Sequence, residues 1–179
     1  MAKGIVRERL NIYYLLDTSV SMKGAKIQQL NIYMKELKSA LEEAAINENI
    51  EILIRVIEFG NGSTARWHIG GARKGVLIED LHWIDLQANG STTPTSIALN
   101  MVADALELEY YRGFLPVIIL ITGGRCTEGE TAYKAACSAL VNKGTIRIAV
   151  NYGDNNMIEL REFASCFSKK YQKNTIWEL

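Results

Sequence analysis

The sequence is poor in cysteine, and the few cysteines that it has exclude two classes of protein. The three residues, Cys126, Cys137 and Cys166, are odd in number and form no C-x-x-C pair. Their spacing indicates neither a disulfide framework nor a cysteine-bound zinc site, so we expect a reducing, cytoplasmic setting. Only two prolines occur in the 179 residues. No repeat, low-complexity tract or interdomain linker is visible, and residues 1–179 are expected to form a single domain.

Long hydrophobic runs and an excess of one charge are also missing. No stretch approaches the roughly 18 uncharged apolar residues of a membrane span, and no apolar leader segment follows the first methionine. Lysine plus arginine equals aspartate plus glutamate, at 20 residues each. This balance gives no bulk attraction to nucleic acid or anionic lipid, and we expect neither as a partner. What is present, 48% hydrophobic and 22% charged residues, is typical of a soluble globular protein.

Apolar runs and amphipathic stretches alternate along the chain. The runs predicted as buried strands are 11–16, 50–59, 115–121 and 146–150, with a last strand at 175–179. The predicted helices are 25–46, one that opens at Thr93-Pro94, one that opens with the capping box Thr127-Glu128-Gly129-Glu130, and 154–164. This alternation predicts an α/β fold: a doubly wound, mainly parallel sheet with helices on both faces. Residues 64–69 are predicted to form an antiparallel strand at one edge.

One carboxylate and two hydroxyls follow the first predicted strand. Asp17, Ser19 and Ser21 stand between the apolar run 12–16 and a long amphipathic helix. In an α/β sheet, ligands bind just outside the carboxyl ends of the strands. Oxygen donors of this number and size suit a small hard cation such as Mg²⁺. The pattern therefore points to a cation site at the end of this strand.

A glycine-rich segment offers a nucleotide-binding alternative. The stretch from Gly60 to Ala65 matches the G-x-G-x-x-A dinucleotide fingerprint and follows a strand. The fingerprint requires a helix next, whose N-terminus holds the pyrophosphate. The following residues, 66–69, alternate like a strand instead, so a hairpin turn is favoured.

An enzymatic alternative uses Asp17 as a nucleophile. Haloacid-dehalogenase-like phosphatases carry such an aspartate at a strand end, and Thr122 and Gly153-Asp154 superficially resemble their later motifs. Their D-x-D core also needs a second carboxylate two residues after the first, as acid/base and metal partner. This chain has Ser19 there, so the phosphatase is the disfavoured alternative.

A third interpretation accounts for more residues. Asp17, Ser19 and Ser21, the later Thr93-Pro94 and the strand that ends at Thr122 resemble the von Willebrand factor A (vWA) domain. In that family, D-x-S-x-S and a later threonine form the metal-ion-dependent adhesion site, or MIDAS. The resemblance runs from about residue 11 to residue 164 and implies a Rossmann-like three-layer sandwich. The bacterial stand-alone members associated with tellurite resistance and stress response are the most similar in character.

The sequence departs from the family pattern after the central strand. Those members typically read Leu-Ile-Thr-Asp-Gly-x-Pro-Thr-Asp, whereas residues 120–128 read Leu-Ile-Thr-Gly-Gly-Arg-Cys-Thr-Glu. Gly123 therefore stands at the position of the aspartate that normally holds metal-bound water. Glu128 keeps an acidic residue at the last position of the segment. Loss of such an outer group lowers metal affinity on the order of 10–100-fold. We expect Mg²⁺ to bind weakly or only with a partner's help, and Glu128 is a candidate for compensation.

The resemblance implies a non-catalytic protein–protein interaction module. Ser19, Ser21 and Thr93 would hold the cation, with Asp17 acting through water. A partner protein would then fill an open coordination position with an Asp or Glu carboxylate. The sequence shows no nucleophile–base pair, so we expect no enzyme. Two alternatives stay open: each residue could serve only local structure, Thr93 as an N-cap for example, or the domain could bind a partner without metal.

Overall fold

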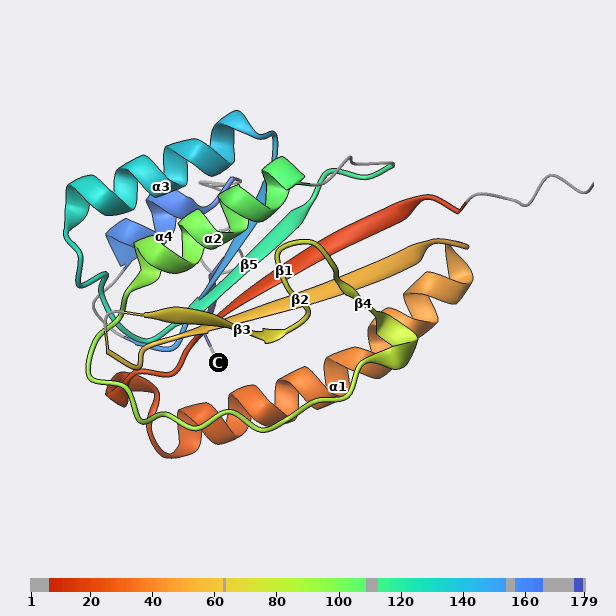
Figure 1. Ribbon diagram of the computed structural model, residues 1–179. Coiled ribbons are helices and arrows are strands. Elements are labelled where there is room, and N and C mark those ends of the chain that lie inside the picture. Colours follow the sequence, from red (N-terminus) through yellow and green to blue (C-terminus); the bar gives the residue numbers. More distant parts are fainter. Residues whose placement is uncertain (1–6, 63, 109–112, 154–156, 166–175, 179) are drawn as a thin grey trace, which may run out of the picture.

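Figure 1 shows the computed structural model of the protein, which describes residues 7–62, 64–108, 113–153, 157–165 and 176–178. The described strands form one sheet in the order β3-β2-β1-β5-β6-β7, and β4 pairs with β2. These strands are β1 (Arg9–Asp17), β2 (Glu51–Phe59), β3 (Ala65–Ile69), β4 (Val76–Leu77), β5 (Val117–Thr122), β6 (Ile146–Asn151) and β7 (Ile176–Glu178).

The sheet is parallel at its centre and antiparallel at one edge, as predicted. β1 pairs in parallel with β2 and β5, and β5 pairs in parallel with β6. β3 is antiparallel to β2, so the turn at Gly60 belongs to a hairpin and not to a nucleotide loop. β7 adds a further parallel strand beside β6. The ends of the predicted strand 175–179 lie outside the described residues.

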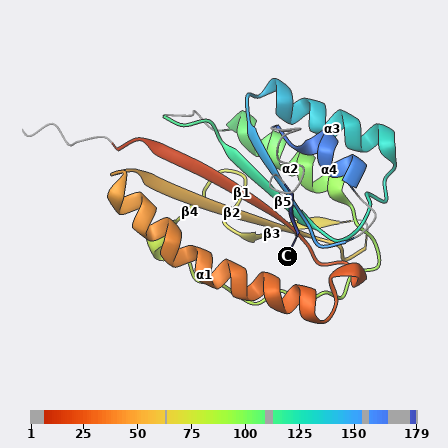
Figure 2. The same cartoon turned by 180° about the vertical axis from the view of Figure 1, so that it is seen from behind.

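Helices cover both faces of the sheet (Figures 1 and 2). They are α1 (Ala25–Asn47), α2 (Thr95–Leu108), α3 (Glu130–Asn142) and α4 (Met157–Phe163), with short 3₁₀ turns η1 (Val20–Met22) and η2 (Ile78–Asp80). α1 lies against one face, and α2, α3 and α4 lie against the other. Every residue of β1 from Asn11 to Asp17 is buried, because this central strand is covered on both sides. No helix in the described part of the chain is long and apolar enough to span a membrane.

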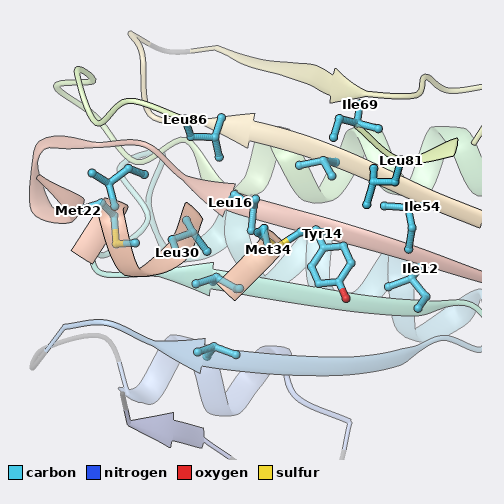
Figure 3. Packing of buried hydrophobic residues seen from close by; sticks show 14 of the residues in the cluster. Ile12, Tyr14, Leu16, Met22, Leu30, Met34, Ile54, Ile69, Leu81 and Leu86 are labelled. Carbon is cyan, nitrogen blue, oxygen red and sulfur yellow. The ribbon is translucent and has the colours of Figure 1, made fainter. Parts of the chain in front are cut away.

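Two hydrophobic clusters fill the spaces between the sheet and its helices. On the α1 side, Leu16 of β1 packs with Leu30 and Met34 of α1 (Figure 3). The same cluster includes Met22 of η1, whose side chain is fully buried. Met22 therefore anchors the loop after β1 in the core, and this loop carries Ser19 and Ser21.

The structure corrects the predicted start of α3. This helix begins at Glu130, and Gly129 at its N-cap makes no side-chain capping bond. The capping box predicted at residues 127–130 is therefore wrong, because the Thr127 hydroxyl accepts from Thr93 N and the Glu130 carboxylate accepts from Lys134 Nζ instead. α4 lies within the predicted helix 154–164, whose first three residues are outside the described part.

The connection between β3 and α2 follows α1 back towards the carboxyl ends of the strands (Figure 1). Trp83 and Leu86 hold it to the body through Asn31 of α1. The Asn31 side chain donates to the Leu86 carbonyl (3.0 Å) and accepts from the Leu86 amide (2.9 Å) and Trp83 Nε1 (3.1 Å). These bonds fix the path of the chain that delivers Thr93 to the site.

Candidate functional site

Close backbone packing brings the loops together at the carboxyl end of the sheet. A Cβ added at Gly60 would lie 2.4 Å from Ser19 N, and one at Gly90 would lie 1.6 Å from Gly60 O. Glycine is therefore required at both positions. Val20 N donates to Gly90 O (2.8 Å), and Gly90 N donates to Thr18 O (3.1 Å). These bonds hold the loop after β1 against the segment that precedes α2.

Asp17, the last residue of β1, is completely buried and ties two strand ends together. Its Oδ1 accepts from Ser19 N (2.7 Å), which closes an Asx-type turn. Its Oδ2 accepts from Thr122 Oγ1 (2.7 Å) and from Gly123 N (3.2 Å). Both carboxylate oxygens therefore have internal donors, and Thr122 is a positioning residue that the sequence analysis did not identify.

Three hydroxyls converge above this carboxylate. Ser19 Oγ and Ser21 Oγ are 2.7 Å apart. A Cβ added at Gly124 would lie 2.8 Å from Thr93 Oγ1 and 3.2 Å from Ser21 Oγ, so both hydroxyls face one point. The structure thus brings Asp17, Ser19, Ser21 and Thr93 together at the carboxyl end of the sheet. Their role as metal ligands stays a prediction.

Thr93 is positioned by the loop after β5. Thr93 N donates to Thr127 Oγ1 (3.2 Å), and Thr127 N donates to Thr93 O (3.1 Å). Glu128 Oε1 accepts from Ile97 N (3.2 Å) in the first turn of α2. Glu128, and not the Thr93 hydroxyl, therefore satisfies an amide of that helix N-terminus. No local sequence signal reveals these roles, because the contacting residues are more than 30 positions apart.

Gly123 has an ordinary backbone conformation, because it is not among the glycines with positive φ. A Cβ there would lie 3.0 Å from Met22 Sδ and 3.5 Å from Ser21 Oγ. The first of these contacts is tight, but it is made with the flexible end of a side chain. An aspartate is thus compatible with the backbone at this position, and its side chain would start beside the hydroxyls.

The donor set fits a hard cation held mainly by neutral oxygens. It offers one carboxylate, from Asp17, and the hydroxyls of Ser19, Ser21 and Thr93. No group of three or more His, Cys, Asp or Glu side chains able to hold a metal occurs within the described ranges. The site is consequently suited to Mg²⁺ or Mn²⁺ more than to a soft metal, with low negative charge.

The thiol nearest the site is held protonated. Burial, and then the hydrogen bond to Glu128, raise the pKa of the Cys126 thiol to about 11. Its Sγ donates to Glu128 Oε2 (3.0 Å). A thiol with this pKa is a poor nucleophile at neutral pH. Asp17 is also a poor candidate for a phosphatase nucleophile, because it is fully buried and both its oxygens accept hydrogen bonds.

Residues 11–177 match the family model described as the von Willebrand factor type A domain. Proximal thread matrix protein 1 from the mussel byssus, with a zinc-occupied MIDAS motif, is 17% identical, with a TM-score of 0.58 over 89% of this chain and 40% of that chain. A von Willebrand factor type A structure from Catenulispora acidiphila is 17% identical, with a TM-score of 0.62 over 88% of this chain and 36% of that chain.

A mutant of the PilB minor pilin from Streptococcus sanguinis is 11% identical, with a TM-score of 0.62 over 90% of this chain and 55% of that chain. The chain thus spans 36% to 55% of the length of these three relatives. At such identities the likeness shows the fold alone. Among proteins of curated function, none matches the chain.

Proposed function

The chain belongs to the von Willebrand factor type A domain family, and we propose that it is a non-catalytic module that holds a protein partner through a divalent cation. The observation that carries this proposal is the convergence of the Ser19, Ser21 and Thr93 hydroxyls above Asp17. The zinc-occupied MIDAS motif of the mussel protein supports it by family likeness.

In this proposal the three hydroxyls hold Mg²⁺, and Asp17 contributes through water. The bound cation would supply a positive point charge for an Asp or Glu carboxylate of the partner. The chain's own residues prepare the site: Thr122 orients Asp17, and Thr127 fixes the backbone of Thr93.

The charge of the site favours assembly with the partner over metal binding alone. Asp17 supplies one negative charge, and Gly123 supplies none. Glu128 does not compensate in this arrangement, because its two oxygens accept from Ile97 N and Cys126 Sγ. The partner's acid would supply the missing charge. The metal is therefore expected to bind the protein–partner complex more tightly than the isolated protein, and the partner is expected to bind the metal-loaded protein more tightly than the metal-free protein.

A metal-free interaction site is the second candidate, favoured by the internal hydrogen bonds that already satisfy Asp17. The cytoplasmic setting and a role in tellurite resistance or stress response stay predictions.

Affinity capture from the native cell, with Mg²⁺ or with EDTA, separates the two candidates. We expect a partner that is retained in Mg²⁺, released by EDTA and lost with Gly124→Ala, whose added methyl group would block Thr93 and Ser21. Ser91→Ala, a change of an exposed residue two positions before Thr93, is the control and should retain the partner. Capture that is equal in Mg²⁺ and EDTA would favour the metal-free site.

A further inference from the structure

A cavity of about 440 Å³ lies beside the amino ends of β1 and β2, at the other end of these strands from the hydroxyl cluster. Leu53 of β2 and Val76 and Leu77 of β4 give it an apolar lining. Arg9 and Glu51 also line it but neutralise each other, because Arg9 Nη2 is 2.7 Å from Glu51 Oε2. The volume is within the roughly 300–1,000 Å³ that is typical of small-molecule sites.

Three further charged residues line this cavity: Arg73, Lys74 and Asp80. All three are exposed. Within the part of the chain that the structure describes, their side chains form no ion pair or hydrogen bond. Two unpaired cations against one unpaired acid leave the cavity with an excess of positive charge, which attracts anions.

A tight turn fixes the backbone that carries Arg73 and Lys74. Gly71 N donates to Lys74 O (2.9 Å), and Arg55 Nε donates to Gly71 O (3.1 Å). Arg55 is completely buried on β2. A Cβ added at Gly75 would lie 3.2 Å from Arg55 Nη1, so glycine lets the chain after the turn pack closely against this guanidinium. Because the backbone of the two cations is already ordered, a ligand loses less free energy in binding them than it would on a flexible loop.

We propose that this cavity binds a small organic anion. The apolar part of the ligand packs on Leu53, Val76 and Leu77, and its carboxylate or phosphate group is bound by Arg73 and Lys74. Guanidinium and ammonium groups bind such oxyanions through charge-assisted hydrogen bonds. The inference is independent of the proposed function, because none of these residues belongs to the hydroxyl cluster.

The test is an NMR titration of the full chain, in metal-free buffer of low salt, with phenyl phosphate and with 3-phenylpropionate. Two matched probes accompany them: 3-phenylpropanol lacks the charge, and inorganic phosphate lacks the apolar part. We expect shifts confined to the amides of residues 53, 71–77 and 80. At least one of the organic anions should bind about threefold more tightly than either matched probe, or better, as for an exposed ion pair. Which of the two anions binds more tightly identifies the charged group that the cavity prefers.

Variants of the charged residues test the two halves of the charge argument. Arg73→Gln and Lys74→Gln should each lower the affinity for the preferred anion about threefold, and added salt should also lower it. Asp80→Asn should raise the affinity, because it removes the unpaired acid that repels the anion. Lys23→Gln, at an exposed position outside the lining of the cavity, is the control and should leave the affinity unchanged.

Three results would overturn the inference. The first is equal affinity for the organic anions and 3-phenylpropanol, and the second is a set of shifts centred elsewhere in the molecule. The third is affinity that is unchanged when Arg73→Gln and Lys74→Gln are combined. A lower affinity in Asp80→Asn would also contradict it, because the acid would then bind the ligand and not repel it. Since no metal is present, none of these results bears on the hydroxyl site.

Discussion

Replacing Gly123 with aspartate would restore the second carboxylate of the family pattern. The backbone allows this change, because Gly123 lies outside the positive-φ region. The new Cβ would be 3.0 Å from Met22 Sδ, which must shift by a few tenths of an ångström, and 3.5 Å from Ser21 Oγ. Loss of glycine's freedom in the unfolded chain stabilises the fold by about 0.4–1 kcal/mol, which offsets part of this crowding. We therefore expect Gly123→Asp to fold.

The second charge should strengthen cation binding markedly. An outer group of this kind changes metal affinity about tenfold or more, equivalent to about 1.4 kcal/mol of binding free energy. Without a cation, the new carboxylate should lower the stability of the fold. Gly123 N is 3.2 Å from Asp17 Oδ2, so the two carboxylates would repel each other as like charges. The melting temperature of Gly123→Asp should thus rise more with Mg²⁺ than that of the wild type.

Calorimetric titration with Mg²⁺ and Mn²⁺, alongside thermal melts with and without EDTA, measures both effects. Gly123→Asn is the matched control, since it adds nearly the same volume without the charge. We expect little gain in affinity for the asparagine variant and at least a tenfold gain for the aspartate variant. An unchanged affinity in a stably folded Gly123→Asp protein would refute the assignment of this pocket as a MIDAS-type site.

Three further predictions follow from individual contacts. Thr127→Val should weaken Mn²⁺ binding several-fold in titrations, and Thr127→Ser should restore it, because Thr127 Oγ1 accepts from the Thr93 amide. Asn31→Ala should lower the free energy of unfolding by about 2–3 kcal/mol in urea titrations, since the Leu86 and Trp83 donors lose their partner. The Cys126 thiol has a pKa raised to about 11, so its alkylation by iodoacetamide, mapped by mass spectrometry, should be slow at pH 8 and accelerate towards that value.

The mainly parallel sheet could be predicted because its central strands are buried on both faces. The run 12–16 is apolar without alternation, as a central strand requires. Placing Asp17, Ser19 and Ser21 at one edge needed only the rule that ligands gather at the carboxyl ends of parallel strands. Bringing Thr93 to the same place required the family pattern, because nothing local links it to the strand 12–16.

The remaining contacts depend on tertiary structure that no short-range pattern encodes. Residues 127–130 read locally as a capping box for α3, but in the fold Thr127 accepts from Thr93 N and Glu128 accepts from Ile97 N of α2. Asn31 resembles any polar residue of an amphipathic helix, yet it is buried and binds the connection before α2. Whether an aspartate fits at position 123 likewise depends on the φ angle of Gly123, which the sequence does not contain.

The proposed function depends above all on a divalent cation that binds among the hydroxyls of Ser19, Ser21 and Thr93. Paramagnetic broadening by Mn²⁺ in the amide NMR spectrum of the full chain tests it directly, and it detects weak binding. We expect substoichiometric Mn²⁺ to broaden first the amides of residues 18–22, 93 and 122–124, excess Mg²⁺ to reverse the effect, and Gly124→Ala to abolish it. Broadening centred on any other part of the molecule, or unchanged in Gly124→Ala, would mean that no cation binds at these hydroxyls.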